Sequence, residues 1–184
     1  METSKKYYLS ESAEKFVAKV FKKKETDGEY RSSFRRAISP RQAYKSYSYI
    51  AGYFDLRNEV AREACLLIGS SIAWEDALVD GPDEFGKALR KSWNDKSKSV
   101  EDVDSGPSVI RLRRLLACRD AVSVCHALRP ILLLVRNRVP GKLKYADLLK
   151  DILWFDRNPE KVKAKWVMDF YASEDKPQAT EDAK

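Results

Sequence analysis

Apolar residues recur every three to four positions along most of the chain, and this period constrains the fold more than any other feature. In one long segment the apolar side of a helix would consist of Val60, Ala64, Leu67, Ile68 and Ile72. No stretch of useful length alternates apolar and polar residues as a half-buried strand would. Seven Gly and seven Pro in 184 residues are too few for a β-sandwich with many tight turns. We therefore predict an all-α fold, a compact bundle of roughly eight helices.

Capping and helix-breaking residues set the expected helix ends. Ser10 and Ser12 are placed to cap the first helix, and Asn58 and Ser108 to cap two later ones. Pro159 suits the first turn of the last helix, where its missing N–H leaves no hydrogen bond unmade. After the first helix, the expected helices cover residues 28–38, 59–78, 85–93, 108–118, 122–135, 145–155 and 159–171.

The length of the chain fits one domain, or two small helical lobes that share a core. Residues 94–107 are polar and contain almost no apolar side chain, so they form the expected loop and the possible lobe boundary. The polar, slightly acidic residues 173–184 are predicted to be a disordered tail. Residues 1–172 are accordingly predicted to form a single all-helical domain.

Neither a membrane nor an oxidising compartment is indicated. The longest apolar run, Ile131 to Val135, is far below the roughly eighteen residues that a membrane span needs. The first residues lead into no apolar core of a secretory signal. Cys65, Cys118 and Cys125 are odd in number and lack CxxC spacing, so they predict neither a disulfide framework nor a zinc site. We expect a soluble, cytoplasmic protein with no bound metal.

The residues of an enzyme are not evident. The single histidine, His126, lies in an apolar helical segment, and its neighbour Cys125 would project about 100° away from it. The two side chains are therefore not placed as base and nucleophile. No phosphate-binding loop, dinucleotide fingerprint or HExxH motif is present. We expect a protein that is not an enzyme and uses no cofactor.

Positive charge is concentrated in one part of the chain. Residues 108–166 contain fourteen Lys or Arg against five Asp or Glu, whereas the whole chain is only +7. On a helix Arg111 and Arg114 share a face, and Arg129 extends the positive surface. Lys161 and Lys165 are one turn apart on the last helix. Guanidinium groups can donate two hydrogen bonds to one phosphate, so the segment indicates a polyanionic partner.

A second basic cluster, Arg31, Arg35 and Arg36, is followed by several tyrosines that could stack on unpaired bases. The alternative reading is that such tyrosines belong to the core and that single basic residues only solvate a helix. For the set as a whole we favour nucleic-acid binding, because acids that would pair these residues locally in the sequence are missing.

The order of motifs along residues 34–171 resembles the CasB family, the small subunit of the type I-E CRISPR complex called Cascade. The final Trp-x-x-x-Phe-Tyr and the Leu-Arg before a leucine run are the most specific matches. The matching stretches are FRRA (34–37), YSYIAGY (47–53), REACLLIGSSIA (62–73), FGKALRK (85–91), RLRRLLACRD (111–120), HALRPILLL (126–134), KYADLLKDILWF (144–155) and VKAKWVMDFY (162–171).

The resemblance implies a non-catalytic, all-helical subunit that is present as two copies in the complex. It would contact the large subunit, the guide-coating backbone subunits, the CRISPR RNA, and the target and non-target DNA strands, and would stabilise the R-loop. Pro130 stands where relatives often have another arginine, so Arg129 would act alone there. With Arg114, the positions expected to bind nucleic acid are Arg35, Arg36, Arg111, Arg129, Lys161, Lys163 and Lys165.

Two other functions remain open from the residues alone. One is an architectural helical adaptor whose basic face docks on an acidic protein surface. The other is a helix-turn-helix regulator, for which the connection 117–122 is the only candidate turn.

Overall fold

The computed structural model describes residues 2–93 and 106–172, with side chains from Leu9 onward. This part of the chain contains nine α-helices and one 3-10 helix and no β-strand, only an isolated bridge between Asp83 and Leu143. The predicted all-α fold is therefore confirmed. The helices are α1 (Glu2–Thr26), α2 (Gly28–Arg36), η1 (Ala43–Ser46), α3 (Tyr47–Ile50), α4 (Glu59–Ala73), α5 (Phe85–Lys91), α6 (Pro107–Leu116), α7 (Ala121–Arg138), α8 (Tyr145–Phe155) and α9 (Pro159–Tyr171).

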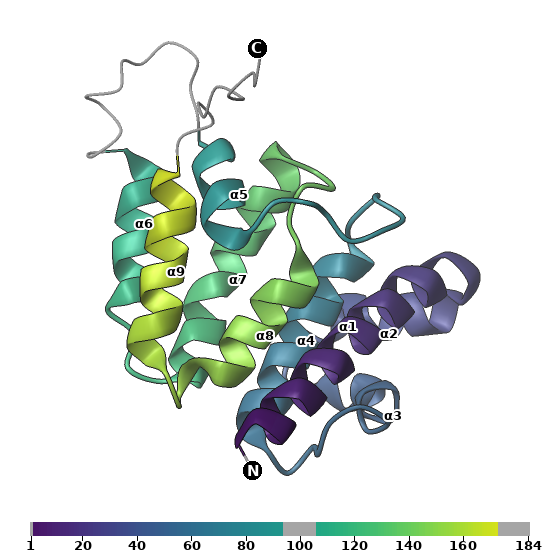
Figure 1. Cartoon of the computed structure of the whole chain (residues 1–184). Coiled ribbons are helices and arrows are strands. Elements are labelled where there is room, and N and C mark those ends of the chain that lie inside the picture. Colours follow the sequence, from purple (N-terminus) through teal and green to yellow (C-terminus); the bar gives the residue numbers. More distant parts are fainter. Residues whose placement is uncertain (1, 94–105, 173–184) are drawn as a thin grey trace, which may run out of the picture.

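Three central helices, α4, α7 and α8, hold the two sides of the molecule together. Helices α1, α2 and α3 lie on one side of them and α5, α6 and α9 on the other (Figure 1). Helix α4 packs against α1, α2, α7 and α8, while α5 packs mainly against α9. Most of the predicted loop 94–107 and the whole predicted tail 173–184 lie outside the described residues.

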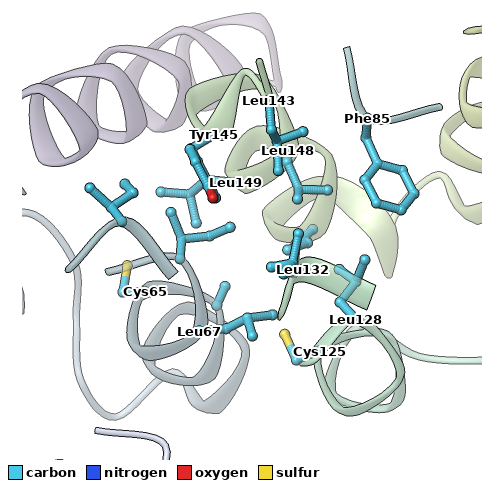
Figure 2. Packing of buried hydrophobic residues seen from close by; sticks show 14 of the residues in the cluster. Cys65, Leu67, Phe85, Cys125, Leu128, Leu132, Leu143, Tyr145, Leu148 and Leu149 are labelled. Atoms are coloured by element: carbon cyan, nitrogen blue, oxygen red, sulfur yellow. The ribbon is translucent and has the colours of Figure 1, made fainter. Parts of the chain in front are cut away.

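The core forms where α4, α7 and α8 meet. Leu67 from α4, Leu132 from α7 and Leu149 from α8 point into the same space (Figure 2). Cys65 and Cys125 are fully buried beside them, and burial raises the pKa of both thiols. The thiols are therefore held in their neutral form and serve as small apolar side chains.

Several helix ends agree with the sequence, and others do not. Asn58 caps α4 as predicted, with its side chain accepting a hydrogen bond from the N–H of Ala61 (3.1 Å). The predicted caps at Ser10 and Ser12 are wrong, because α1 begins eight residues before the first of them. Ser108 is likewise not a cap. The helix α6 starts one residue earlier at a proline that fits its first turn.

Helix α4 ends at Ala73, five residues before the predicted end at Leu78. A buried polar junction holds the chain that follows it. The carboxylate of Glu75 accepts hydrogen bonds from the hydroxyl of Tyr145 (2.9 Å) and the N–H of Gly141 (2.8 Å). The amine of Lys24 donates to the carbonyls of Glu75 and Ala77. Since buried polar groups must be paired, these bonds draw the chain away from the helix axis and leave Trp74 at the surface.

Candidate nucleic-acid interface

Two arginines lie against the indole of Trp74, which is 46% exposed at the end of α4. The guanidinium of Arg35 from α2 is 4.3 Å from the ring centroid, and that of Arg136 from α7 is 5.8 Å away. The Nε–H of Arg35 also donates to the carbonyl of Ala73 (2.9 Å), which is one of the free carbonyls at the end of α4. Arg35 is thus held by a ring and by a backbone acceptor together.

The same arrangement occurs at Trp93, which follows α5. The guanidinium of Arg111 from α6 is 4.2 Å from the indole centroid, and that of Arg138 from α7 is 5.4 Å away. One terminal N–H of Arg111 donates to the carbonyl of Pro107 (3.0 Å). We call these two groups the Trp74 clamp (Arg35, Trp74, Arg136) and the Trp93 clamp (Arg111, Trp93, Arg138).

Both clamps take one arginine from the last turn of α7. Arg136 and Arg138 are two positions apart, so they project about 200° from each other around the helix axis. Helices α2 and α6, which supply the other two arginines, lie at opposite sides of the molecule (Figure 1). The end of α7 is therefore the structural link between the two clamps.

Among the residues that the structure describes, no carboxylate forms an ion pair with the arginines of the clamps. Partial burial and the charge of Arg31 lower the pKa of Arg35, and the charge of Arg136 adds to this, while the carboxylate of Asp76 opposes it only in part. Like charges are thus held close together, which favours binding of an anion.

Trp74 borders an open hollow of about 400 Å³ between α2, α4 and α7. Its walls include the exposed apolar side chains of Ile38 and Leu133, with Arg136 at its rim. A ligand can therefore approach the clamp from solvent.

Five of the eight predicted positions form no ion pair with any carboxylate of the described ranges. Arg35 and Arg111 belong to the clamps. Arg36, Arg114 and Lys161 are exposed, and their charged groups contact no carboxylate in the described part of the chain.

The other three predicted positions are ion-paired. Arg129 lies 3.0 Å from Glu63 of α4, and Lys165 lies 2.9 Å from Asp151 of α8. Lys163 lies 3.4 Å from the glutamate at the start of its own helix. Although burial alone lowers the pKa of Lys165, the charge of Asp151 and its hydrogen bond raise that pKa overall. The expectation that acids are missing nearby in the sequence is therefore wrong for Lys163, and for the other two positions the fold brings the acid from another helix.

The tyrosines that follow α2 divide between the interior and the surface. Tyr49 packs against Tyr30 (ring centroids 4.5 Å apart), and Tyr53 packs edge-on against Phe16 (5.7 Å). Tyr44 is largely exposed. Tyr47 is half-buried against the core. The core interpretation therefore holds for Tyr49 and Tyr53 and in part for Tyr47, whereas Tyr44 is open to a ligand.

The two tryptophans of the clamps were not predicted from the sequence. Each lies just after a helix, and its nearer arginine is 39 residues before it in one clamp and 18 after it in the other. No local spacing pattern joins these positions. The only available signal was that a large aromatic residue stands next to a helix end on a basic chain.

The described residues show no group of three or more His, Cys, Asp or Glu that could hold a metal ion. Among these same residues, no helix is long and apolar enough to cross a membrane.

The fold and the clamps define an all-α protein with a basic surface whose clamp arginines form no ion pair within residues 2–93 and 106–172. The sequence profile of CRISPR-associated protein Cse2 matches residues 30–171, which is most of the chain. The chain belongs to the Cse2 family, and the predicted resemblance to CasB is confirmed.

Solved structures show the same fold at low sequence identity. CasB from Thermobifida fusca is 17% identical with a TM-score of 0.68, covering 90% of this chain and 98% of that one. A Cse2-family protein from Thermus thermophilus is 22% identical with a TM-score of 0.64, covering 88% and 98%. A chain of a CRISPR RNA-guided surveillance complex is 19% identical with a TM-score of 0.67, covering 88% and 92%. A comparison with curated protein sequences gives no significant match.

Proposed function

We propose that this protein is a non-catalytic small subunit of a type I-E CRISPR RNA-guided surveillance complex, in which it binds nucleic acid without sequence preference. Membership of the Cse2 family and the likeness to a chain of such a complex support the assembly. The two clamps carry the nucleic-acid part of the proposal, because they present four guanidiniums with no carboxylate partner among the described residues.

Phosphate contacts are sufficient for this role. Guide pairing supplies sequence specificity in such complexes, so a subunit that reads only the backbone does not need base contacts. R-loop formation is close to energetic balance, because the RNA–DNA duplex replaces a DNA duplex of similar stability. A few charge-assisted contacts to the target or the displaced strand would therefore stabilise the R-loop.

The proposed partners are the CRISPR RNA, the target and non-target strands, the large subunit, the guide-coating subunits and a second copy of this chain, in the cytoplasm. The test is salt-dependent binding of the isolated protein to single-stranded DNA and RNA. We expect weak binding that falls steeply as salt rises, because bound phosphates release counterions. Binding that is absent at low salt would overturn the nucleic-acid role.

The assembled complex gives the second test. Arg111→Ala should weaken capture of target DNA without affecting assembly, because the contacts of Arg111 among the described residues are to its own helix and to Trp93. Arg129→Ala should have a smaller effect, because its guanidinium is already paired with Glu63. If a variant that combines Arg111→Ala with Arg129→Ala captures target DNA as well as wild type does, neither residue belongs to the interface.

An architectural adaptor is the second candidate, and one observation favours it. Leu78 and Val79, in the segment after α4, are 64% and 71% exposed, which is unusual for adjacent aliphatic residues. Co-purification with and without ribonuclease separates the two functions. An adaptor stays bound to its protein partner after digestion, whereas partners tethered through RNA are released.

A further inference from the structure

We propose that Trp74 and Trp93 are positioning residues, which hold two pairs of arginines in place for the phosphates of one nucleic-acid strand. This inference rests on the proposed function and identifies the part of the surface that performs it. It assigns the indoles a role in orienting cations and not in reading bases. The two clamps then act together, one on each side of the last turn of α7.

Each clamp contains one firmly held arginine and one that is held less tightly. The guanidiniums of Arg35 and Arg111 lie 4.3 Å and 4.2 Å from the centroids of their rings. Each donates one N–H to a backbone carbonyl. A guanidinium has five N–H donors in a planar fork, so four remain for phosphate oxygens. Arg136 and Arg138 lie farther from the rings, at 5.8 Å and 5.4 Å, and have no other partner in the described regions.

The indole is what makes these arginines effective binders. A free arginine side chain loses rotamer entropy when it binds a phosphate. An arginine stacked on an aromatic face is already ordered before binding, so it loses less. Stacking also keeps two like charges together, which would otherwise separate into solvent. An incoming phosphate relieves that repulsion, which at the Trp74 clamp the carboxylate of Asp76 offsets only in part.

The arrangement of the clamps favours a single strand as the ligand. Arg136 and Arg138 point to different sides of a helix that is about 10–12 Å across with its side chains. A flexible single-stranded backbone can follow this turn and place phosphates in both clamps. A free phosphate ion can occupy only one, so it lacks the gain from simultaneous binding.

Binding of fluorescently labelled oligothymidine to the full-length chain tests the inference. Trp74→Leu and Trp93→Leu should each weaken binding by about threefold to tenfold, since each removes two cation–π contacts. Log affinity falls as log salt rises, and each variant should make this slope less steep by roughly one unit. Trp74→Phe and Trp93→Phe should recover most of the affinity, because phenylalanine keeps an aromatic face.

Trp154→Leu is the matched control. Trp154 lies on α8, and the guanidinium of Arg157 is 5.1 Å from the centroid of its ring, outside both clamps. Its replacement should leave oligothymidine binding within twofold of wild type. A loss at Trp154 equal to that at Trp74 and Trp93 would overturn the assignment of the clamps.

A double-mutant cycle separates positioning from direct base stacking. In an Arg35→Gln, Arg136→Gln background, Trp74→Leu should cause no further loss of affinity. A further loss of threefold or more would show that the indole itself contacts the ligand and would overturn the inference. Wild-type affinity in both leucine variants would also overturn it, while leaving the proposed function in place.

Charge-preserving variants cover the case in which a leucine variant does not fold. Arg136→Lys and Arg138→Lys keep the charge but lose the planar group that lies on the indole. Each should weaken binding by about threefold with an unchanged melting temperature. Unchanged affinity would contradict the inference, and a wild-type protein that binds no oligonucleotide would overturn the proposed function and this inference with it.

Discussion

Two basic regions of this protein look alike in the sequence and differ in the structure. The lysines of α9 repeat along one helix, and two of the three, Lys163 and Lys165, are paired with carboxylates. The arginines around Trp74 and Trp93 are scattered along the chain, yet the fold gathers them on two rings, where no carboxylate of the described residues forms an ion pair with them. Formal charge is therefore a poor measure of the charge that is available to a ligand.

The difference follows from what each residue stabilises. Lys165 connects α9 to α8 through Asp151, which also accepts a hydrogen bond from the buried indole of Trp166 (2.9 Å). Its main contribution is to the fold. The clamp arginines are held by aromatic faces and backbone carbonyls, which fix their positions and leave their charge unneutralised.

The largest expected effect is on binding. Arg35→Gln combined with Arg111→Gln should weaken oligonucleotide binding by about tenfold to a hundredfold, because each removes a charge-assisted contact to phosphate. Fluorescence anisotropy measures this, with Lys163→Gln as the control that should change affinity less than twofold. If the α9 control lost as much as the clamp variant, the contrast between the two regions would be broken.

The next effect is on stability. Lys165→Met should lower the free energy of unfolding by about 2 kcal/mol, because Asp151 is left 13% exposed without its cation. The value is below the roughly 3–5 kcal/mol of fully buried pairs, since Lys165 itself is 35% exposed. Urea denaturation measures the change. Adding Asp151→Asn should restore part of the loss, and no recovery would contradict this explanation.

Arg129 should behave as an intermediate case. Its ion pair with Glu63 is partly exposed, so Arg129→Gln should cost about 0–1 kcal/mol of stability. Oligonucleotide affinity should stay within twofold of wild type. Glu63→Gln frees Arg129 and should strengthen binding slightly. An affinity that does not rise in that variant would show that the freed Arg129 contributes nothing to the interface.

The smallest effect concerns pH. Burial, together with a hydrogen bond to Glu84 and its charge, raises the pKa of Asp169 to about 6. A carboxyl whose pKa is raised by folding stabilises the protein fully below its ordinary pKa of 3.8, and this contribution is lost as pH rises through 6. Solvent screening limits the change to about a few tenths of a kcal/mol.

Melting temperatures of wild type and Asp169→Asn across this range measure the effect. The wild type should lose more stability than the variant between about pH 4 and 7. Parallel curves for the two proteins would show that Asp169 does not titrate there.

The helical fold could be predicted from the sequence because its signals are local. The apolar period, the cap at Asn58 and the proline that starts α9 act within a few residues, and the structure confirms them. Helix α4 ends early for a reason that the sequence does not show, since Lys24 and Tyr145 reach the chain after it from distant segments. Periodicity carries no information on such contacts.

The candidate site could be predicted only in part, for the same reason. Arginine-rich stretches identified Arg35 and Arg111 as candidates, but their indole partners come from other elements. The acids that pair Arg129 and Lys165 are 66 and 14 residues away. The positions of the basic residues can be read from the sequence. Which of them form ion pairs is decided by tertiary contacts.

The most direct measurement of the central claim uses the four tryptophans of the chain as reporters. In a proton–nitrogen correlation spectrum, each indole N–H gives its own signal during titration with oligothymidine. The signals of Trp74 and Trp93 should shift, while that of Trp166, whose N–H is bonded to Asp151, and that of Trp154 should not. Shifts confined to Trp154 and Trp166 would place the ligand on the α8–α9 side and contradict the account.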